Sequence, residues 1–152
     1  MTRAFHVDRA FDFDVDPESL WAVLSQTADY PRWWSWLRAV DVDGLREGAT
    51  ARCLVRAPVP FELRFAVTVR RLVRPTLVDT EVGGDIEGDA RLELTALPSG
   101  TRARLVWDVD PRSTVVRAAA RAARPLLVWG QDWVIGTGAR QFRRRALGAS
   151  RR

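Results

Sequence analysis

The chain of 152 residues contains one cysteine and one histidine, and it contains no lysine. A lone cysteine, Cys53, excludes an internal disulfide, and the apolar residues Ala51 and Val55, two positions away on either side, indicate a small buried side chain. His6 and Cys53 are the only side chains of their kinds and lie far apart in the sequence, so they cannot supply the usual ligands of a metal site. The same shortage argues against Ser-His-Asp and Cys-His mechanisms. We therefore expect no metal ion and no cofactor, and the sequence identifies no catalytic residue.

Long hydrophobic runs are also missing. The first residues contain no apolar stretch of the kind found in signal peptides, and no run approaches the roughly 18 apolar residues of a membrane-spanning helix. We expect a cytoplasmic protein without integral membrane contact. The abundance of alanine, valine and arginine, with no lysine, is typical of a GC-rich bacterial genome.

Charge of one sign does not dominate the chain. The formal net charge is +5, and acidic residues are interleaved with arginines over most of the length, which predicts a solvated mixed surface and no nucleic-acid partner. Only residues 140–152 are basic without acidic neighbours, and no aromatic platform accompanies them. We interpret residues 1–148 as one domain and 149–152 as a basic tail. A protein-interaction domain that uses this tail is the least supported function, and the sequence favours no oligomeric state.

The first two thirds of the chain are dominated by strand patterns. Residues 5–15 place apolar side chains on one parity and acidic ones, together with His6, on the other, as a half-buried strand does. Asp16 followed by Pro17 predicts the start of a helix. Further alternating runs predict antiparallel strands at residues 38–43, 50–57, 61–73, 76–82, 86–94 and 103–109.

The period changes to helical between Ser113 and about Leu147, with a kink or a helix boundary expected at Pro125. Several glycines inside this helix indicate close packing on the sheet or space between sheet and helix. The order of elements predicts an α+β fold, in which a curved antiparallel sheet wraps around the long C-terminal helix and short helices follow the first strand. Two neighbouring stripes form the expected inward face of the last helix: Leu127, Gln131, Val134, Gly138 and Phe142, and beside them Leu126, Trp133 and Thr137.

Tryptophan is concentrated in one short segment. Residues 30–37 read YPRWWSWL and hold three of the seven tryptophans, directly after the first helix. Tryptophan combines a large apolar body with one N–H donor, so such a cluster either fills a core or walls a cavity for an apolar guest. As a group, these side chains favour a cavity.

Four segments follow one another at a characteristic spacing: Tyr-Pro-Arg-Trp-Trp at 30–34, Gly-Asp-Ile-Glu-Gly at 84–88, Gly-Thr-Arg at 100–102 leading to Trp107-Asp108-Val109, and Ala-Arg-Pro-Leu at 123–126 leading to Trp129 and Asp132. In this order they resemble the SRPBCC superfamily of START domains and birch-pollen-allergen-like proteins, and within it the polyketide cyclase/dehydrase-like branch. The resemblance implies a helix-grip fold with a cavity between the sheet and the C-terminal helix, suited to an apolar or aromatic small molecule. A shared fold does not determine the reaction.

The chain departs from this resemblance at Gly130 and Gln131, where many relatives carry Asn-His before the aspartate of the last helix. Gln131 can donate and accept hydrogen bonds, but it cannot transfer protons at neutral pH. Inside an apolar stripe its amide needs a partner, which a ligand, a water molecule or a backbone group could supply. Asp132 lies further round the helix and is expected at the surface.

Two functions follow from this pattern. The leading hypothesis is binding of a hydrophobic, aromatic or polyketide-like small molecule. The alternative is an enzyme of the polyketide cyclase, aromatase or dehydratase type, which folds its substrate in the same cavity without a metal or a nucleophile. The sequence identifies no inward titratable group, which favours binding. The expected ligand-binding residues are Trp33, Trp34, Trp36, Phe65, Trp107, Leu127, Gln131 and Val134.

Overall fold

The structure is a computed structural model that describes residues 5–34, 36–41, 44–56 and 62–147. The strands are β1 (Phe5–Phe13), β2 (Leu37–Asp41), β3 (Thr50–Val55), β4 (Leu63–Val73), β5 (Leu77–Gly84), β6 (Ile86–Leu97) and β7 (Gly100–Pro111). The helices are α1 (Pro17–Leu24), the 3-10 helix η1 (Thr27–Asp29), α2 (Tyr30–Trp33), α3 (Thr114–Ala122), α4 (Arg124–Gln141) and the π-helix η2 (Phe142–Leu147). Parts of three predicted segments lie outside the described residues, namely positions 42–43, 57 and 61 at strand ends, and so does the tail at 149–152.

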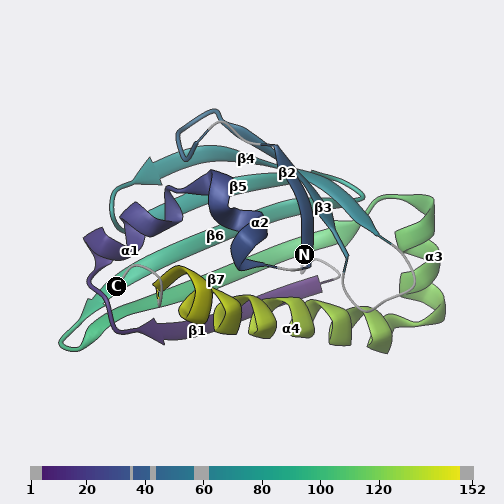
Figure 1. Cartoon of the computed structure of the whole chain (residues 1–152). Coiled ribbons are helices and arrows are strands. Elements are labelled where there is room, and N and C mark those ends of the chain that lie inside the picture. Colours follow the sequence, from purple (N-terminus) through teal and green to yellow (C-terminus); the bar gives the residue numbers. More distant parts are fainter. Residues whose placement is uncertain (1–4, 35, 42–43, 57–61, 148–152) are drawn as a thin grey trace.

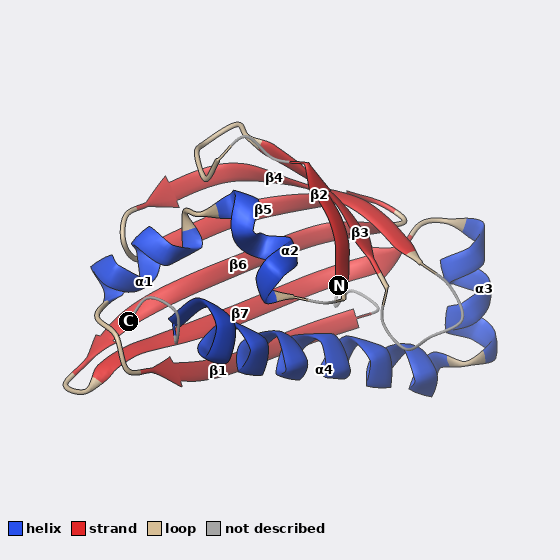
Figure 2. Cartoon of the chain, in the orientation of Figure 1, coloured by secondary structure: helices blue, strands red, loops and turns tan. Residues whose placement is uncertain are grey.

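The seven described strands form one antiparallel sheet in the order β1-β7-β6-β5-β4-β3-β2. Strands β2 to β7 follow one another as a meander, and β1 pairs with the last of them, from Phe5 opposite Val109 to Phe13 opposite Thr101. The sheet curves, and α4 crosses its concave side together with α1 and α2 (Figure 1; Figure 2). The predicted strands and the predicted helix-grip arrangement are therefore confirmed.

Local sequence explains where the helices begin. Asp16 caps α1 by accepting a hydrogen bond of 3.2 Å from the backbone N–H of Ser19, and the Ser19 hydroxyl donates to the same carboxylate. These hydrogen bonds to the charged form lower the pKa of Asp16. Ser113 caps α3 in the same way, by accepting from Val116 N–H at 3.2 Å.

A boundary near Pro125 separates α3 from α4, as predicted. Ala123 has φ −147° and ψ 48°, so the chain leaves the helical conformation for one residue. Pro125 then occupies the first turn of α4, where its missing N–H deprives the helix of no hydrogen bond. The result is a short helix and a long helix joined by an elbow, which leaves the long helix free to cross the sheet (Figure 2).

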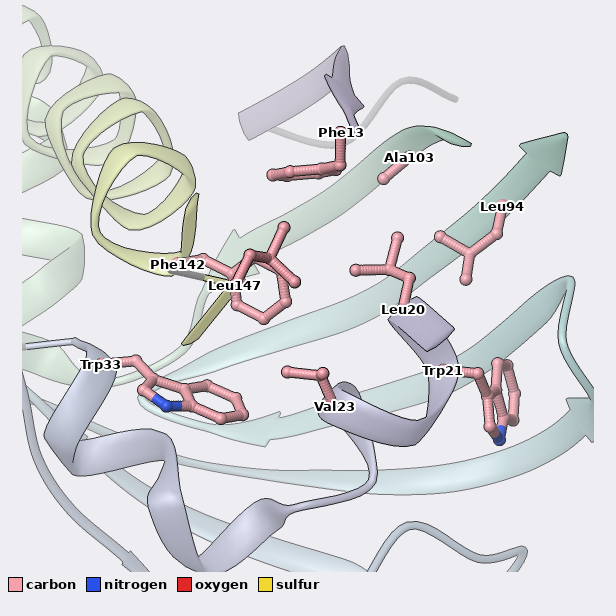
Figure 3. Packing of buried hydrophobic residues seen from close by; sticks show 9 residues of the cluster. All are labelled: Phe13, Leu20, Trp21, Val23, Trp33, Leu94, Ala103, Phe142 and Leu147. Atoms are coloured by element: carbon pink, nitrogen blue, oxygen red, sulfur yellow. The ribbon is translucent and has the colours of Figure 1, made fainter. Parts of the chain in front are cut away.

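Two apolar clusters form the core. Figure 3 shows the larger cluster, where α1, α2 and η2 meet the sheet around Leu20, which is 1% exposed. The smaller cluster contains Phe5, Val82, Ile86, Val109 and Val116, and it joins the sheet to α3. The larger one consists of Phe13, Leu20, Trp21, Val23, Trp33, Leu94, Ala103, Phe142 and Leu147.

The convex face of the sheet carries alternating charges. Arg104 joins two carboxylates from neighbouring strands, Asp8 on β1 at 2.5 Å and Glu93 on β6 at 3.6 Å. Arg70 in turn bridges Asp79 at 3.2 Å and Asp89 at 2.8 Å. Among them, Asp8 lies on the acidic parity that the sequence pattern predicted for residues 5–15.

Candidate functional site: an apolar cavity under the last helix

A cavity of about 430 Å³ lies between the concave face of the sheet and α4. This size falls within the usual range of small-molecule pockets. The helix wall consists of Leu127, Gly130, Gln131, Val134, Ile135, Gly138 and Ala139, followed by Phe142. The sheet wall consists of inward side chains of β1, β3, β4, β6 and β7: Phe5, Phe11, Phe13, Val55, Leu63, Phe65, Ile86, Ala90, Leu92, Ala103, Leu105, Trp107 and Val109.

The described lining is almost entirely apolar. Gln131 supplies its one amide side chain, and no side chain that carries a formal charge belongs to the described part of the wall. Three tryptophans, Trp34, Trp36 and Trp107, add indole N–H groups, which can donate hydrogen bonds but cannot accept them. The cavity is therefore suited to an uncharged guest with a large apolar surface.

Of the expected ligand-binding residues, all except Trp33 lie in this wall. Trp33 is 6% exposed and belongs to the larger core cluster, where its ring meets that of Phe142 edge to face at 5.4 Å. Trp33 therefore does not belong to the described cavity wall. The physical reason is that Trp33 ends α2, and this short helix directs the ring toward η2, whereas the extended Trp34 that follows turns toward the cavity.

The second stripe predicted on the inward face of α4 is corrected at one position, Leu126. Leu126 is 37% exposed, and Trp133 and Thr137 do not belong to the described cavity wall. Gly130, Ile135 and Ala139 lie beside the first stripe instead. The face of α4 that lines the cavity therefore includes three of its small residues, Gly130, Gly138 and Ala139.

Gly138 shows why a small residue is needed in this helix. Its carbonyl oxygen accepts a hydrogen bond of 2.9 Å from Trp34 Nε1. A Cβ at this position would lie 3.2 Å from Cζ2 of Trp36 and 3.6 Å from Nε1 of Trp34. The rings of Trp34 and Trp36 stack with centroids 5.6 Å apart and an interplanar angle of 27°. The glycine therefore lets the helix rest against this indole pair.

The third tryptophan of the wall lies on the sheet. Trp107 on β7 meets Phe65 of β4 edge to face, with ring centroids 6.2 Å apart. Both residues occupy the inward parity predicted for their strands. The other inward residues of β1, β6 and β7 reach the same cavity, although they were not among the expected ligand-binding residues, and their parity was the signal that could have identified them.

Gln131 lies at the cavity wall, half-buried, and makes no side-chain hydrogen bond to the described residues. Asp132 points away and is exposed, as expected. The amide of Gln131 is thus available to a guest, whereas the neighbouring carboxylate is not directed into the cavity.

Two titratable side chains, Tyr30 at the start of the tryptophan segment and Cys53 on β3, do not line the described cavity. Burial raises the pKa of the Cys53 thiol to about 11. Burial, and to a smaller extent the nearby Cys53, raises the pKa of Tyr30, whose hydroxyl donates to the carbonyl oxygen of Leu24. Burial therefore disfavours the charged form of both groups, and neither side chain belongs to the described cavity wall.

Two further features concern the described residues as a whole. They contain no cluster of three or more histidine, cysteine, aspartate or glutamate side chains that could hold a metal ion. None of their helices has both the length and the apolar character required to cross a membrane.

The comparison with protein families decides the classification. A family model described as polyketide cyclase/dehydrase and lipid transport matches residues 4–147. The chain belongs to this family. The match spans the sheet, the elbow and α4, so membership covers every element that builds the cavity. No curated protein sequence matches this SRPBCC protein.

Solved structures share the fold at low sequence identity. TTHA0849 from Thermus thermophilus is 13% identical, with a TM-score of 0.80, over 96% of this chain and 99% of that one. A START superfamily protein from Mycobacterium smegmatis is 14% identical, with a TM-score of 0.73, over 95% and 98%. The di-domain ARO/CYC protein BexL from a biosynthetic pathway is 12% identical, with a TM-score of 0.73, over 93% of this chain and 50% of that one. These likenesses establish the fold and leave the activity open.

Proposed function

We propose that this SRPBCC protein binds a hydrophobic, aromatic or polyketide-like small molecule in the cavity between the sheet and α4. The observation that carries the proposal is the cavity itself, which has about 430 Å³ of space behind a lining almost free of polar side chains. A void of this size costs stability, because its lining loses packing contacts. A guest restores those contacts and removes its own apolar surface from water.

An enzyme of the cyclase, aromatase or dehydratase type is the alternative, and the family description and the likeness to an ARO/CYC protein support it. General acid–base catalysis needs a titratable group within hydrogen-bond reach of the substrate. The described lining offers Gln131 and indole N–H groups, which do not titrate at neutral pH. An enzyme built on this cavity would act by holding a flexible substrate in a reactive conformation.

The binding proposal is tested with fluorene, an uncharged tricyclic hydrocarbon, whose binding is measured by the change in tryptophan emission. Val134 lies in the cavity wall, so Val134→Phe adds volume inside the cavity and should weaken binding by tenfold or more. Asp132→Ala changes an exposed residue of the same helix and is the matched control. Native mass spectrometry of the freshly purified protein would reveal a co-purifying guest. Equal fluorene affinity in both variants, with unchanged circular dichroism, would place binding elsewhere.

A further inference from the structure

Two buried hydrogen-bond donors in the cavity wall lack a partner. Both belong to tryptophans that line the cavity. Trp36 directly precedes β2, and Trp107 lies in the middle of β7. The Nε1 atom of each is buried, and neither has a hydrogen-bond partner among the described residues. Buried polar groups in folded proteins are almost always paired, so two unpaired donors in one cavity call for a physical reason.

A third indole in the same wall provides the comparison. Trp34 stacks on Trp36, but its Nε1 donates to the carbonyl oxygen of Gly138 at 2.9 Å. Within the stacked pair, the described residues therefore supply a backbone acceptor for the indole N–H of Trp34 and none for that of Trp36. The donors of Trp36 and Trp107, one near α4 and one on the sheet, have no such partner among the described residues.

The chemistry of the donors narrows the class of guest. An indole N–H donates and does not accept, so its partner must carry an acceptor such as a carbonyl oxygen. A carboxylate also accepts, but its charge would be buried in a described lining that contains no cationic side chain. Burial of an unpaired charge is strongly unfavourable. A pure hydrocarbon fits the apolar wall but leaves both donors unsatisfied.

From this geometry we infer that the indole N–H groups of Trp36 and Trp107 recognise the acceptor oxygens of an uncharged guest, such as an aromatic ketone. The inference rests on the proposed binding function and specifies the class of ligand. The amide of Gln131, on the opposite wall from Trp107, adds a group that can donate or accept, and it serves a guest that also carries a hydroxyl group.

The test compares 9-fluorenone with fluorene, two molecules of nearly the same shape that differ by one carbonyl oxygen. The measured quantity is the ratio of the two dissociation constants in each protein, because a ratio cancels losses of apolar contact that affect both ligands. Trp36→Phe and Trp107→Phe each keep an aromatic ring and remove the N–H donor. At least one of them should reduce the preference for fluorenone by about tenfold, the size of one well-made hydrogen bond.

Trp34→Phe is the matched control, because it removes an indole of the same wall whose donor is already bonded to Gly138. It should leave the ratio unchanged, whatever it does to stability. Fluorenone-2-carboxylate, which adds a negative charge to the same frame, should bind at least a hundredfold more weakly than fluorenone. An unchanged ratio in both Trp36→Phe and Trp107→Phe would overturn the inference and leave the binding proposal intact. If neither fluorene nor fluorenone bound the wild-type protein, both proposals would fall.

A second measurement needs no variant and decides the question if a substitution prevents folding. The seven tryptophans give separate indole N–H signals in a ¹⁵N correlation spectrum, which triple-resonance experiments can assign. Addition of fluorenone should move the Trp36 or Trp107 signal downfield, as expected for a new hydrogen bond, more than fluorene does. The Trp34 signal should respond alike to both ligands. Identical responses of Trp36 and Trp107 to the two ligands would contradict the inference.

Discussion

The two faces of the sheet are built by the same strands and differ in almost every physical respect. On the concave face, inward side chains such as Phe65 and Trp107 surround a cavity whose described wall carries no formal charge. On the convex face, Arg104 and Arg70 connect carboxylates from neighbouring strands. Successive side chains of a strand point to opposite faces, so one alternating sequence produces both surfaces.

The difference shows where stability and binding reside. The convex ion pairs are exposed to solvent, where side-chain entropy and screening offset most of the attraction, so each pair contributes little. On the concave side, the removal of apolar surface from water dominates at both clusters. The cavity under α4 is the part of this side that the protein's own side chains leave unfilled, and it is where a guest contributes most. Substitutions on the two sides should therefore differ in size as well as in kind.

The largest expected effect comes from a tryptophan on the concave side. Trp33→Ala should lower the free energy of unfolding by ~3–5 kcal/mol, because it empties a closely packed core site. Trp33 is 6% exposed, whereas Trp129 on the outward face of α4 is 50% exposed. Trp129→Ala is therefore the control and should change stability by less than ~1 kcal/mol. Urea unfolding followed by circular dichroism measures both. Equal losses of unfolding free energy in the two variants would mean that Trp33 is not closely packed in the core.

Substitutions at two glycines of α4 should change stability by an intermediate amount, and they compare a position away from the indole pair with one that touches it. Gly136→Ala should stabilise the protein by ~0.5–1 kcal/mol, because alanine favours the helix and its Cβ meets only arginine side-chain ends at 3.7 Å. Gly138→Ala should stabilise the protein less, because the new Cβ lies 3.2 Å from Cζ2 of Trp36 and the indole must shift. Thermal unfolding measures the gain, and a change in tryptophan emission for Gly138→Ala alone reports the shift. A larger gain at Gly138 than at Gly136 would show that this indole wall is not closely packed.

A smaller effect concerns acid stability of the convex face. Hydrogen bonds from Arg104 and Arg102 hold the pKa values of Asp8 and Asp12 below their usual range. A depressed folded-state pKa means that the stabilisation is complete above the unfolded pKa, near ~3.9, and is lost as pH falls below it. The urea midpoint of the wild type should therefore fall between about pH 4 and pH 2 more steeply than that of Asp12→Asn. Asp132→Asn, at an exposed site of α4, should follow the wild type.

The last prediction is that pH does not change the affinity of the cavity for a ligand. The described cavity wall contains no group that titrates near neutrality, and His6 lies on the convex face, 2.5 Å from Asp108. Fluorene affinity should therefore stay constant between about pH 5.5 and pH 8, a range that includes the usual histidine pKa of ~6.5. A clear midpoint between pH 6 and pH 7 that persists in His6→Ala would contradict this expectation. It would indicate a carboxylate with a raised pKa facing the cavity.

Much of this architecture follows from local sequence. Alternation along residues 86–94 and 103–109 predicted which side chains face inward, because the strand period is two and one face meets water. Asp16 and Ser113 marked helix starts, and Pro125 marked the elbow, because capping and proline act on the nearest few residues. The family followed from the order of four short motifs, and the match over residues 4–147 confirmed it.

The tertiary structure decided which side chains share the cavity. Trp33 and Trp34 are adjacent in the sequence, yet one lies in the core and the other in the wall, because the backbone changes from helical to extended between them. The periodicity of α4 predicted which residues share a stripe, but it did not predict how the helix is rotated about its axis relative to the sheet. The sequence pattern therefore placed Leu126 on the inward face, although this side chain is exposed. Such choices depend on contacts between residues about a hundred positions apart, as between Trp34 and Gly138. A local pattern predicts which faces an element has, and only packing against the other elements determines what each face meets.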